Sequence, residues 1–340
     1  GLDAPGKSTL EEAEVFSNEG LTKSAVDGIK IAFADTNGHR GRFLPFYGFN
    51  TDVEWYNASE STSDDKPDLS IYDAKPNNGQ MNVALTEGGG GNPWTSMYTG
   101  IERANMCIRG IRKYADPKPG PEFGYLLGEA LTLRAVYYAD LLKAWGDVPA
   151  RFEPVNSQNL YVPKSSRDII YKQLIDDLDE AATLVPWPNE STRTGSVERI
   201  NKAFVKGFRA RLALAASGFQ QYPDGIRRSD DPELSVARMY DLALRECRSV
   251  IESGSAHLES TFEGFWRKYN QEVTAAGGES LWEIPFGDGR GRMLFTFAVN
   301  HTNSDQHHAN GANRGGVAGP LPTVFYDFDQ LDTRRDVTCV

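Results

Sequence analysis

The chain has 340 residues, of which 39% are hydrophobic and 24% are charged, enough to bury a large core in one domain or two fused domains. Its 36 basic and 47 acidic residues give a net charge of −11, without the basic clusters typical of nucleic-acid or anionic-lipid binding. We therefore exclude nucleic acid as a direct partner. No apolar run is long enough to cross a membrane.

The amino-terminal third of the chain predicts little regular structure. Residues 1–18 are mostly polar, and we expect a tethered arm. Apolar residues then recur at three and four positions between Leu21 and Phe33 and predict a first helix. From residue 40 to residue 92 this period disappears, and aromatic residues are mixed with Asn, Asp, Ser and Gly. So long a segment with so many aromatic rings indicates an ordered, functional loop.

Five further helices are predicted from apolar residues that recur at three and four positions. They begin near residues 93, 124, 166, 201 and 235, and residues suited to cap four of them are Asn92, Ser165, Asn201 and Ser235. Short connections make neighbouring helices antiparallel, which predicts an array of helical hairpins over residues 93–254.

The helix predicted over Gly124–Trp145 carries the widest apolar arc of the chain. Polar residues gather on a narrow strip opposite this arc: Glu129, Thr132, Asp140 and Lys143. Arg134 projects from the middle of the apolar arc, so we expect a carboxylate or helix-end carbonyl groups against its guanidinium. The helix is therefore interpreted as scaffold and not as a ligand site.

The last helix of the array is predicted to bury one apolar row, whose members are Ala237, Tyr240, Leu244, Cys247 and Ile251. Together with Cys107 and Cys339, Cys247 makes a set of three cysteines without the close spacings of a zinc site, so we expect free, buried thiols. No cofactor is expected.

Beyond residue 260 the pattern changes. Ser280–Phe286 predicts a strand, and residues 287–322 form a second irregular segment rich in Gly, Asn and His. A metal ion could be gathered there by His301, Asp305, His307 and His308, but polar loops that carry histidines usually bind none, and we predict no metal.

Six segments follow one another along the chain: NPWTSMYTGIERANMCI, GEALTLRAVYYADLLKAWGDVP, SSRDIIYKQLIDDLDEAATLVP, RINKAFVKGFRARLALAASG, YDLALRECRSVIESG and SLWEIPF. The closing YDFDQLDTRRD adds an Asp-x-Arg-Arg motif. In this order they resemble the SusD/RagB family of Bacteroidetes outer-membrane lipoproteins, also called SusD-like proteins. The resemblance covers nearly the whole chain.

This resemblance implies a mainly α fold: a tetratricopeptide-like (TPR-like) helical-hairpin array, an irregular loop-rich ligand-binding region and little β structure. We expect one SusD-like domain over residues 1–340, with its scaffold at about 93–254 and ligand-region insertions at about 40–92 and 287–322. Family members continue past the Asp-x-Arg-Arg segment, so we expect the native carboxy-terminal portion to be missing here.

The family's role is to bind a glycan, or sometimes a peptide, at the cell surface and to pass it to a SusC-like TonB-dependent outer-membrane transporter. No catalysis is implied. Attachment to the outer membrane is through a lipid anchor, and no cysteine that could carry one precedes Leu2.

Ligand residues in the family come from the two irregular segments, which implies a site at residues 49–57 and about 290–314 of this chain. Sugar rings have apolar C–H faces that stack on aromatic rings and hydroxyl groups that need polar partners. Trp55 and Tyr56 are the predicted stacking residues, and the predicted hydrogen-bonding residues are Asp52, Asn57, Arg290, His307 and Asn310.

Two other functions are compatible with the sequence. The chain could be a helical-repeat scaffold that docks only onto other proteins. It could also be an α-rich glycoside hydrolase that uses Asp52 and Glu54 as its pair of carboxylates. The aromatic loops and the order of the six segments favour glycan binding over both.

Overall fold

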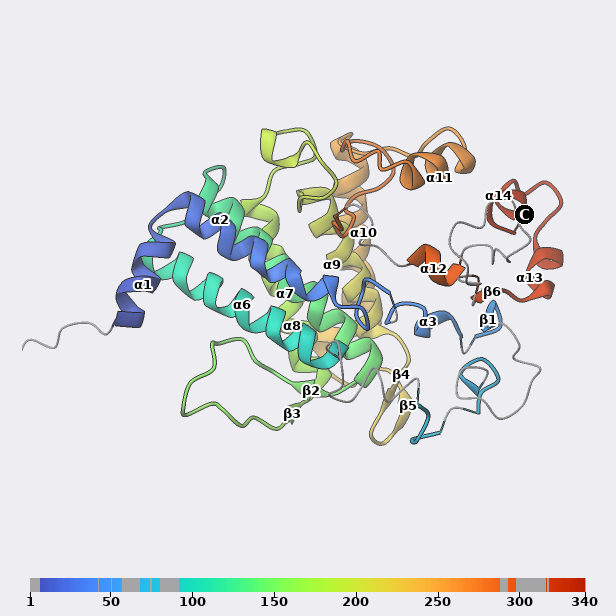
Figure 1. Cartoon of the computed structure of the whole chain (residues 1–340), viewed down its shortest axis with the longest axis horizontal. Helices are drawn as coiled ribbons and strands as arrows, with labels where there is room; N and C mark the ends of the chain where they lie inside the picture. Colours follow the sequence, from blue (N-terminus) through green and yellow to red (C-terminus); the bar gives the residue numbers. More distant parts are fainter. Residues whose placement is uncertain are drawn as a thin grey trace, which may run out of the picture. The chain divides into compact units, whose positions relative to one another are not determined.

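The computed structural model describes residues 7–41, 43–49, 51–56, 68–73, 75–79, 92–287, 293–297, 316 and 318–339 (Figure 1). These residues form a helix-rich fold with few and short strands, which confirms the predicted fold class. The chain divides into two compact units. The helical unit comprises residues 1–31, 97–260 and 268–284, and the loop unit comprises residues 32–96, 261–267 and 285–340.

The helical unit is a series of helices in which each member packs against the next. Its long helices are α6 (Pro93–Tyr114, from residue 97 onward), α7 (Glu122–Trp145), α8 (Arg167–Leu184), α9 (Lys202–Ser217) and α10 (Val236–Ser253). α7 packs on α8, α8 on α9, and α9 on α10 (Figure 1). This consecutive packing is the predicted array of helical hairpins.

Shorter elements complete the helical unit. They are α1 (Lys7–Phe16), α2 (Glu19–Asp27), η1 (Gly28–Ala34, which continues into the loop unit), β2 (Val148–Pro149) paired with β3 (Lys164–Ser165), η2 (Thr192–Thr194), β4 (Gln220–Tyr222) paired with β5 (Gly225–Arg227), and η3 (Pro232–Leu234). Residues 7–16 of the predicted tethered arm form the helix α1. This helix is held because Phe16 is buried and fits against Gly110 of α6, where there is no side chain in the way.

The loop unit holds short elements. They are α3 (Phe46–Phe49), β1 (Glu54–Tyr56), most of α11 (Phe262–Asn270), α12 (Met293–Phe297), β6 (Ala318–Pro320), α13 (Pro322–Asp327) and α14 (Arg334–Cys339). The prediction of a strand over Ser280–Phe286 was wrong. The segment makes single bonds instead of a ladder: the backbone N–H of Glu283 donates to the Val197 carbonyl at 2.9 Å.

The predicted helix starts are set by side-chain caps. Asn92, Asn201 and Ser235 each accept a hydrogen bond from a backbone N–H three residues on, at 2.8, 2.9 and 3.3 Å, as predicted. For α8 the cap is Ser166 and not Ser165. Ser165 pairs with Val148 in the β2–β3 hairpin, so the next residue takes the capping role.

α7 is buried on every side from Gly124 to Tyr138, so over this stretch the polar strip opposite the apolar arc does not face solvent. Glu129 and Thr132 are both 0% exposed. The Glu129 carboxylate accepts a hydrogen bond from the Tyr125 hydroxyl at 2.9 Å and pairs with Arg199 at 3.1 Å, while the Thr132 hydroxyl donates to the Gly128 carbonyl. The Thr132 hydroxyl and one oxygen of Glu129 thus find hydrogen-bond partners inside the protein, and the second oxygen of Glu129 lies 3.8 Å from the Lys30 ammonium group.

Arg134 has the partner that its place in the apolar arc requires. Its guanidinium forms an ion pair with Asp177 of α8 at 2.7 Å, in which both side chains are less than 8% exposed. It also donates to the Asn105 side chain of α6 at 2.9 Å and to the Phe152 carbonyl at 3.3 Å. Three helices and the segment after β2 are thus joined through one side chain, and the predicted structural role of Arg134 has a physical basis.

α10 buries a different face from the one that was predicted. The row predicted to be buried is exposed, with exposed fractions of 51% for Tyr240, 50% for Leu244 and 76% for Ile251. Met239 and Leu242 are buried instead, on the face that packs against α9. The helix carries two apolar faces, and periodicity alone does not say which one packs.

The prediction of free, buried thiols was correct for Cys107, whereas the other two cysteines are free but not buried. Cys107 is a buried free thiol, and burial raises its pKa to about 12. Cys247 is exposed, because it lies on the outer face of α10, and Cys339 is half-buried. Among the residues that the structure describes, no helix is both long and apolar enough to cross a bilayer.

Replacing Arg134 with Leu tests the buried ion pair. The variant leaves the Asp177 carboxylate buried without its cation, so the free energy of unfolding is expected to fall by about 3–5 kcal/mol. Chemical denaturation measures the change. Arg112→Leu is the matched control, since Arg112 also binds α8, through Glu180 at 2.7 Å, but is 46% exposed. The free energy of unfolding of Arg112→Leu is expected to fall by less than about 1 kcal/mol, and equal falls in the two variants would contradict the role of burial.

Candidate functional site

The two irregular segments of the sequence meet in one small sheet of the loop unit. β1, from the first segment, pairs antiparallel with β6, from the second. In this register Trp55 lies opposite Gly319, and Tyr56 lies opposite Ala318. The pairing continues past the strands, where the Leu321 backbone N–H donates to the Val53 carbonyl at 2.9 Å. The structure therefore brings two distant parts of the sequence together at the residues predicted to stack on a sugar.

Tyr56 points to the packed face of this sheet. Its ring meets the Phe49 ring edge-on, with centroids 5.4 Å apart, and packs on a small buried cluster that includes Leu69 and Ala318. Its backbone N–H donates to the Ser70 hydroxyl at 2.7 Å. The side chain of Tyr56 thus holds the sheet against α3, and this contact gives the residue a packing role.

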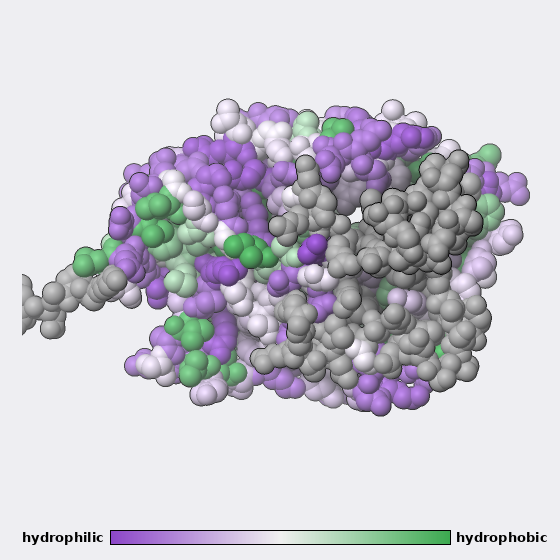
Figure 2. All heavy atoms as spheres, in the orientation of Figure 1, coloured by the Kyte–Doolittle hydropathy of each residue, from purple (hydrophilic) through white to green (hydrophobic). Residues whose placement is uncertain are grey.

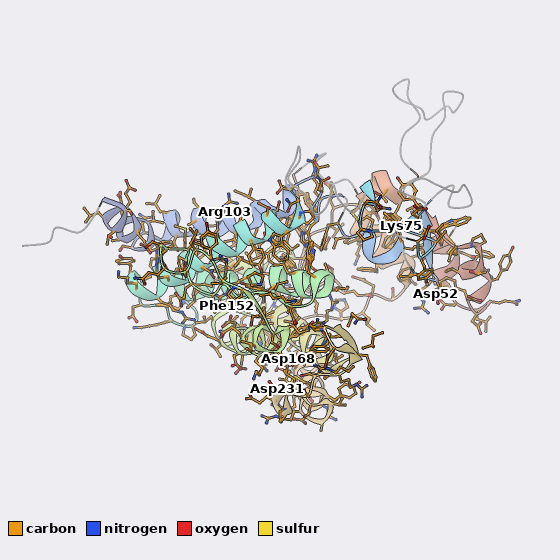
Figure 3. All side chains as sticks on the ribbon, turned by 90° about the horizontal axis from the view of Figure 1, so that it is seen from below. Asp52, Lys75, Arg103, Phe152, Asp168 and Asp231 are labelled. Atoms are coloured by element: carbon orange, nitrogen blue, oxygen red, sulfur yellow. The ribbon has the colours of Figure 1, made fainter. Side chains whose placement is uncertain are left out.

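Glu54 lies on the same face as Tyr56, because side chains two residues apart in a strand share a face. Its carboxylate lies directly against Gly48, where any larger residue would collide with it. Burial raises the pKa of Glu54 above its ordinary value. Asp52 lies in an exposed bend before the strand (Figure 3).

Trp55 points to the opposite face, and it is only partly buried. Its cross-strand neighbour Gly319 has no side chain, and a Cβ built there would meet no heavy atom within 4 Å. Residues directly opposite in an antiparallel pair project to the same side. The structure therefore leaves open space at Gly319, on the face to which Trp55 projects, while the other face of the sheet is filled.

The remaining predicted ligand residues, Asn57, Arg290, His307 and Asn310, lie outside the described residues. The same is true of His301, Asp305 and His308 of the alternative metal site. In the part of the chain that the structure describes, no group of three or more His, Cys, Asp or Glu side chains is placed to hold a metal ion.

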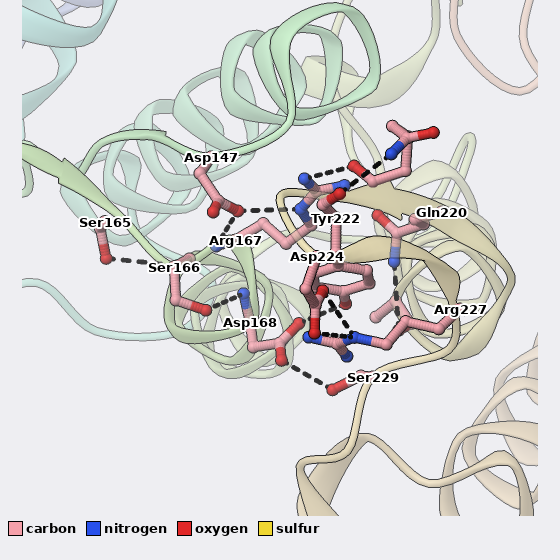
Figure 4. A network of polar contacts seen from close by, with 12 residues as sticks. Asp147, Ser165, Ser166, Arg167, Asp168, Gln220, Tyr222, Asp224, Arg227 and Ser229 are labelled. Atoms are coloured by element: carbon pink, nitrogen blue, oxygen red, sulfur yellow. Dashed lines mark hydrogen bonds and ion pairs between the residues drawn. The ribbon is translucent and has the colours of Figure 1, made fainter.

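A second polar cluster, at the start of α8, is structural (Figure 4). The Arg167 guanidinium and backbone N–H donate to Asp147, and the Arg167 side chain also donates to the Gln221 carbonyl at 2.7 Å. Burial raises the pKa of Asp147, but the hydrogen bonds and charge of Arg167 outweigh it, so the pKa lies below its ordinary value. The Tyr222 hydroxyl donates to Asp168 at 2.7 Å. These contacts fix the β4–β5 hairpin on α8.

The helical unit also has a pocket of about 370 Å³ between the α6–α7 connection and the end of α8. It is lined by Pro119, Gly120, Thr183, Leu184, Val185, Pro186, Glu190, Ser191 and Lys202. No aromatic ring lines this pocket, so it offers no surface on which a sugar could stack. The candidate ligand site is therefore the Trp55 face of the β1–β6 sheet.

Comparisons with known proteins bear on the whole chain. Residues 49–214 match the SusD-like family model described as starch-binding and associating with the outer membrane. A curated relative from Formosa agariphila, named SusD-like protein P38, is 34% identical over 94 residues, which are 26% of this chain and 17% of that protein. The chain is thus SusD-like over residues 49–214.

Solved structures of SusD-like proteins share the fold. A SusD homolog from Bacteroides thetaiotaomicron matches 98% of this chain with a TM-score of 0.73 at 17% identity. Surface glycan-binding protein A from Bacteroides uniformis matches 95% with a TM-score of 0.70 at 20% identity. The chain spans 59% and 64% of the lengths of these two SusD-like structures.

Gly319 is the residue of this site that sequence reasoning missed. It belongs to the Gly-rich second segment, where nothing distinguishes it from its neighbours, and only the β1–β6 register places it beside Trp55. A strand glycine often marks a point where a ligand approaches closely, and this was the one available signal.

Alanine substitutions separate the two faces of the β1–β6 sheet. Tyr56→Ala removes a ring that packs on Phe49 and Leu69, so we expect it to lower the free energy of unfolding by about 2–4 kcal/mol. Trp55→Ala removes a ring beside open space and is expected to cost less than about 1 kcal/mol. Chemical denaturation followed by circular dichroism measures both, and a larger loss for Trp55→Ala would contradict this assignment of faces.

Proposed function

We propose that the chain binds a glycan on the Trp55 face of the β1–β6 sheet and presents it to a TonB-dependent outer-membrane transporter. The observation that carries the proposal is the partly exposed Trp55, which lies opposite Gly319 with open space at that position. The match of residues 49–214 to a family model described as starch-binding supports the same ligand class.

The chemistry of a pyranose fits this arrangement. Its apolar C–H face packs on a flat indole, which supplies a large contact area with few rotatable bonds. The hydroxyl groups around the ring edge need polar partners, and Asp52 is exposed at the start of the strand. Asn57, Arg290, His307 and Asn310 are proposed as further hydrogen-bonding partners from the two loops. A peptide with an aromatic or aliphatic side chain is the alternative ligand.

A binding role is favoured over hydrolysis by the direction of the acidic side chains. Glycosidases place two carboxylates on either side of the scissile bond. Glu54 is directed to the packed face, against Gly48, while Trp55 is directed to the open face. A sugar stacked on Trp55 would therefore have the sheet between itself and the Glu54 carboxylate.

Delivery to a transporter and attachment to the cell surface through a lipid anchor are proposed from the family as a whole. The expected partner is a SusC-like transporter. Co-purification of a TonB-dependent transporter with this chain from outer membranes tests this part. Recovery of the chain without any transporter would contradict it and would leave glycan binding to be judged separately.

Two substitutions test the binding site with soluble glycans. Trp55→Ala removes the stacking surface and is expected to weaken binding by about 2 kcal/mol, or roughly 30-fold in Kd. Gly319→Val fills the space beside the ring and is expected to weaken binding about tenfold, without loss of stability, because Val favours strands. Isothermal titration calorimetry against starch, laminarin and a peptide mixture identifies the ligand class and measures both effects.

Tyr161→Ala is the matched control for these variants. Tyr161 is the most exposed large hydrophobic residue of the described chain, at 92%, and lies in the helical unit. Its removal is expected to leave the affinity unchanged. Binding that survives in Trp55→Ala but not in Tyr161→Ala would place the site elsewhere, and hydrolysis of a glycan by the pure protein would establish the enzymatic alternative.

A further inference from the structure

The outer face of α10 carries a continuous row of apolar side chains that the fold does not cover. Its members, which we call the outer seam, are Ala237, Tyr240, Leu244, Cys247 and Ile251, and all five are exposed. They are separated by three, four, three and four residues. This is the spacing of the a and d positions of a coiled coil, and it keeps the five side chains within an arc of about 80°.

The outer seam is distinct from the face that holds α10 in the protein. Met239, Leu242 and Ala243 are buried on the side that packs against α9, and Glu246 on that side pairs with Lys206 of α9 at 3.4 Å. A helix with one buried face needs no second apolar row for its own stability. Hydrophilic residues dominate the coloured part of the surface in Figure 2, where hydrophobic residues form small separate patches. A five-residue seam of this kind marks an interaction surface.

The position of α10 in the fold explains why a partner is needed. Among the described residues it comes last in the series α7, α8, α9 and α10, and helical arrays need a polar outer face on their terminal helix. The outer seam has the opposite character, so it continues the stacking pattern instead of ending it.

We propose that the outer seam pairs with the outer seam of a second copy of the chain, with the two α10 helices antiparallel. In that arrangement a positions meet d positions across the interface. Tyr240 then lies opposite Ile251 of the second copy, and Leu244 lies opposite Cys247. The large Tyr240–Ile251 pair lies at each end of the interface and the smaller Leu244–Cys247 pair lies near its centre, because the two-fold symmetry repeats each pair.

Charges beside the outer seam select the antiparallel orientation. Asp241 and Arg248 occupy the two e positions that flank the seam, and both are exposed. Antiparallel helices place e positions opposite e positions, so Asp241 of each copy faces Arg248 of the other. Asp241 pairs with Arg245 of its own helix through Oδ2 at 3.0 Å, which leaves its second oxygen for this contact.

Two α10 helices that ran parallel would not bring Asp241 and Arg248 together. They would place e positions opposite g positions, which are Val236, Ala243 and Val250. Neither Asp241 nor Arg248 would then meet an opposite charge. The pattern of charges therefore fits a second copy in one orientation.

The oligomeric state of the purified chain tests the proposal. Sedimentation velocity measures the mass in solution, and a reductant prevents disulfides through Cys247. The chain is studied between about 1 and 200 μM, because a seam of two heptads makes a small interface and therefore a weak dimer. The expected result is a concentration-dependent shift from the 37.6 kDa chain to twice that mass. Leu244→Asp is expected to stay monomeric while keeping the circular dichroism spectrum and glycan binding of the parent, since it changes only an exposed position.

Charge exchange tests the orientation. Asp241→Arg and Arg248→Asp each place like charges opposite one another and are expected to weaken the dimer about tenfold, whereas the double variant restores it. Arg238→Asp is the control, because it makes the same charge change as Arg248→Asp at an exposed position outside the pairs.

A chain that stays monomeric up to the highest concentration overturns the proposal and leaves the outer seam to a different polypeptide or to the carboxy-terminal portion that is expected to be missing here. A dimer that survives Leu244→Asp overturns it as well. A double charge variant as weak as the single ones overturns the antiparallel register. None of these results bears on glycan binding, which is tested by Trp55→Ala.

Discussion

The ion pair between Arg134 and Asp177 is the constraint on which the helical unit depends. α7 is enclosed on all sides, so its one cation in the apolar arc must find its counter-charge inside the protein. Asp177 supplies the charge from α8, and Asn105 supplies a further acceptor from α6. Burying two charges without this geometry would cost several kcal/mol, so the pair fixes the packing of the three helices relative to one another.

The loop unit depends on a different interaction, the pairing of β1 with β6. The ladder joins two segments that are far apart in the sequence, and Tyr56 closes the sheet onto Phe49 and Leu69. Because alternate residues of a strand project to opposite sides, the packing of Tyr56 directs Trp55 the other way. The residue proposed to touch the ligand is thus positioned by its neighbour in the sequence.

The helices could be predicted because the sequence signals that define a helix lie within a few residues of one another. Caps such as Asn92 and Asn201, and apolar residues at helical spacing, are readable within a few turns. The face of α10 could not be predicted, since it has two apolar rows and the sequence does not say which meets α9. The partner of Arg134 was foreseeable as a carboxylate but not as Asp177. Gly319 was not identifiable either, because its place beside Trp55 rests on a pairing between residues far apart in the chain.

The central claim is that a glycan contacts Trp55, and fluorine NMR of the chain labelled with 5-fluorotryptophan tests it most directly. The six tryptophans give separate resonances, and Trp55→Phe assigns the one of interest. On titration with the glycan that binds, the Trp55 resonance is expected to shift or broaden in step with occupancy, while those of Trp187 and Trp266 stay fixed. A bound glycan that leaves the Trp55 resonance unchanged and moves another one would contradict the account.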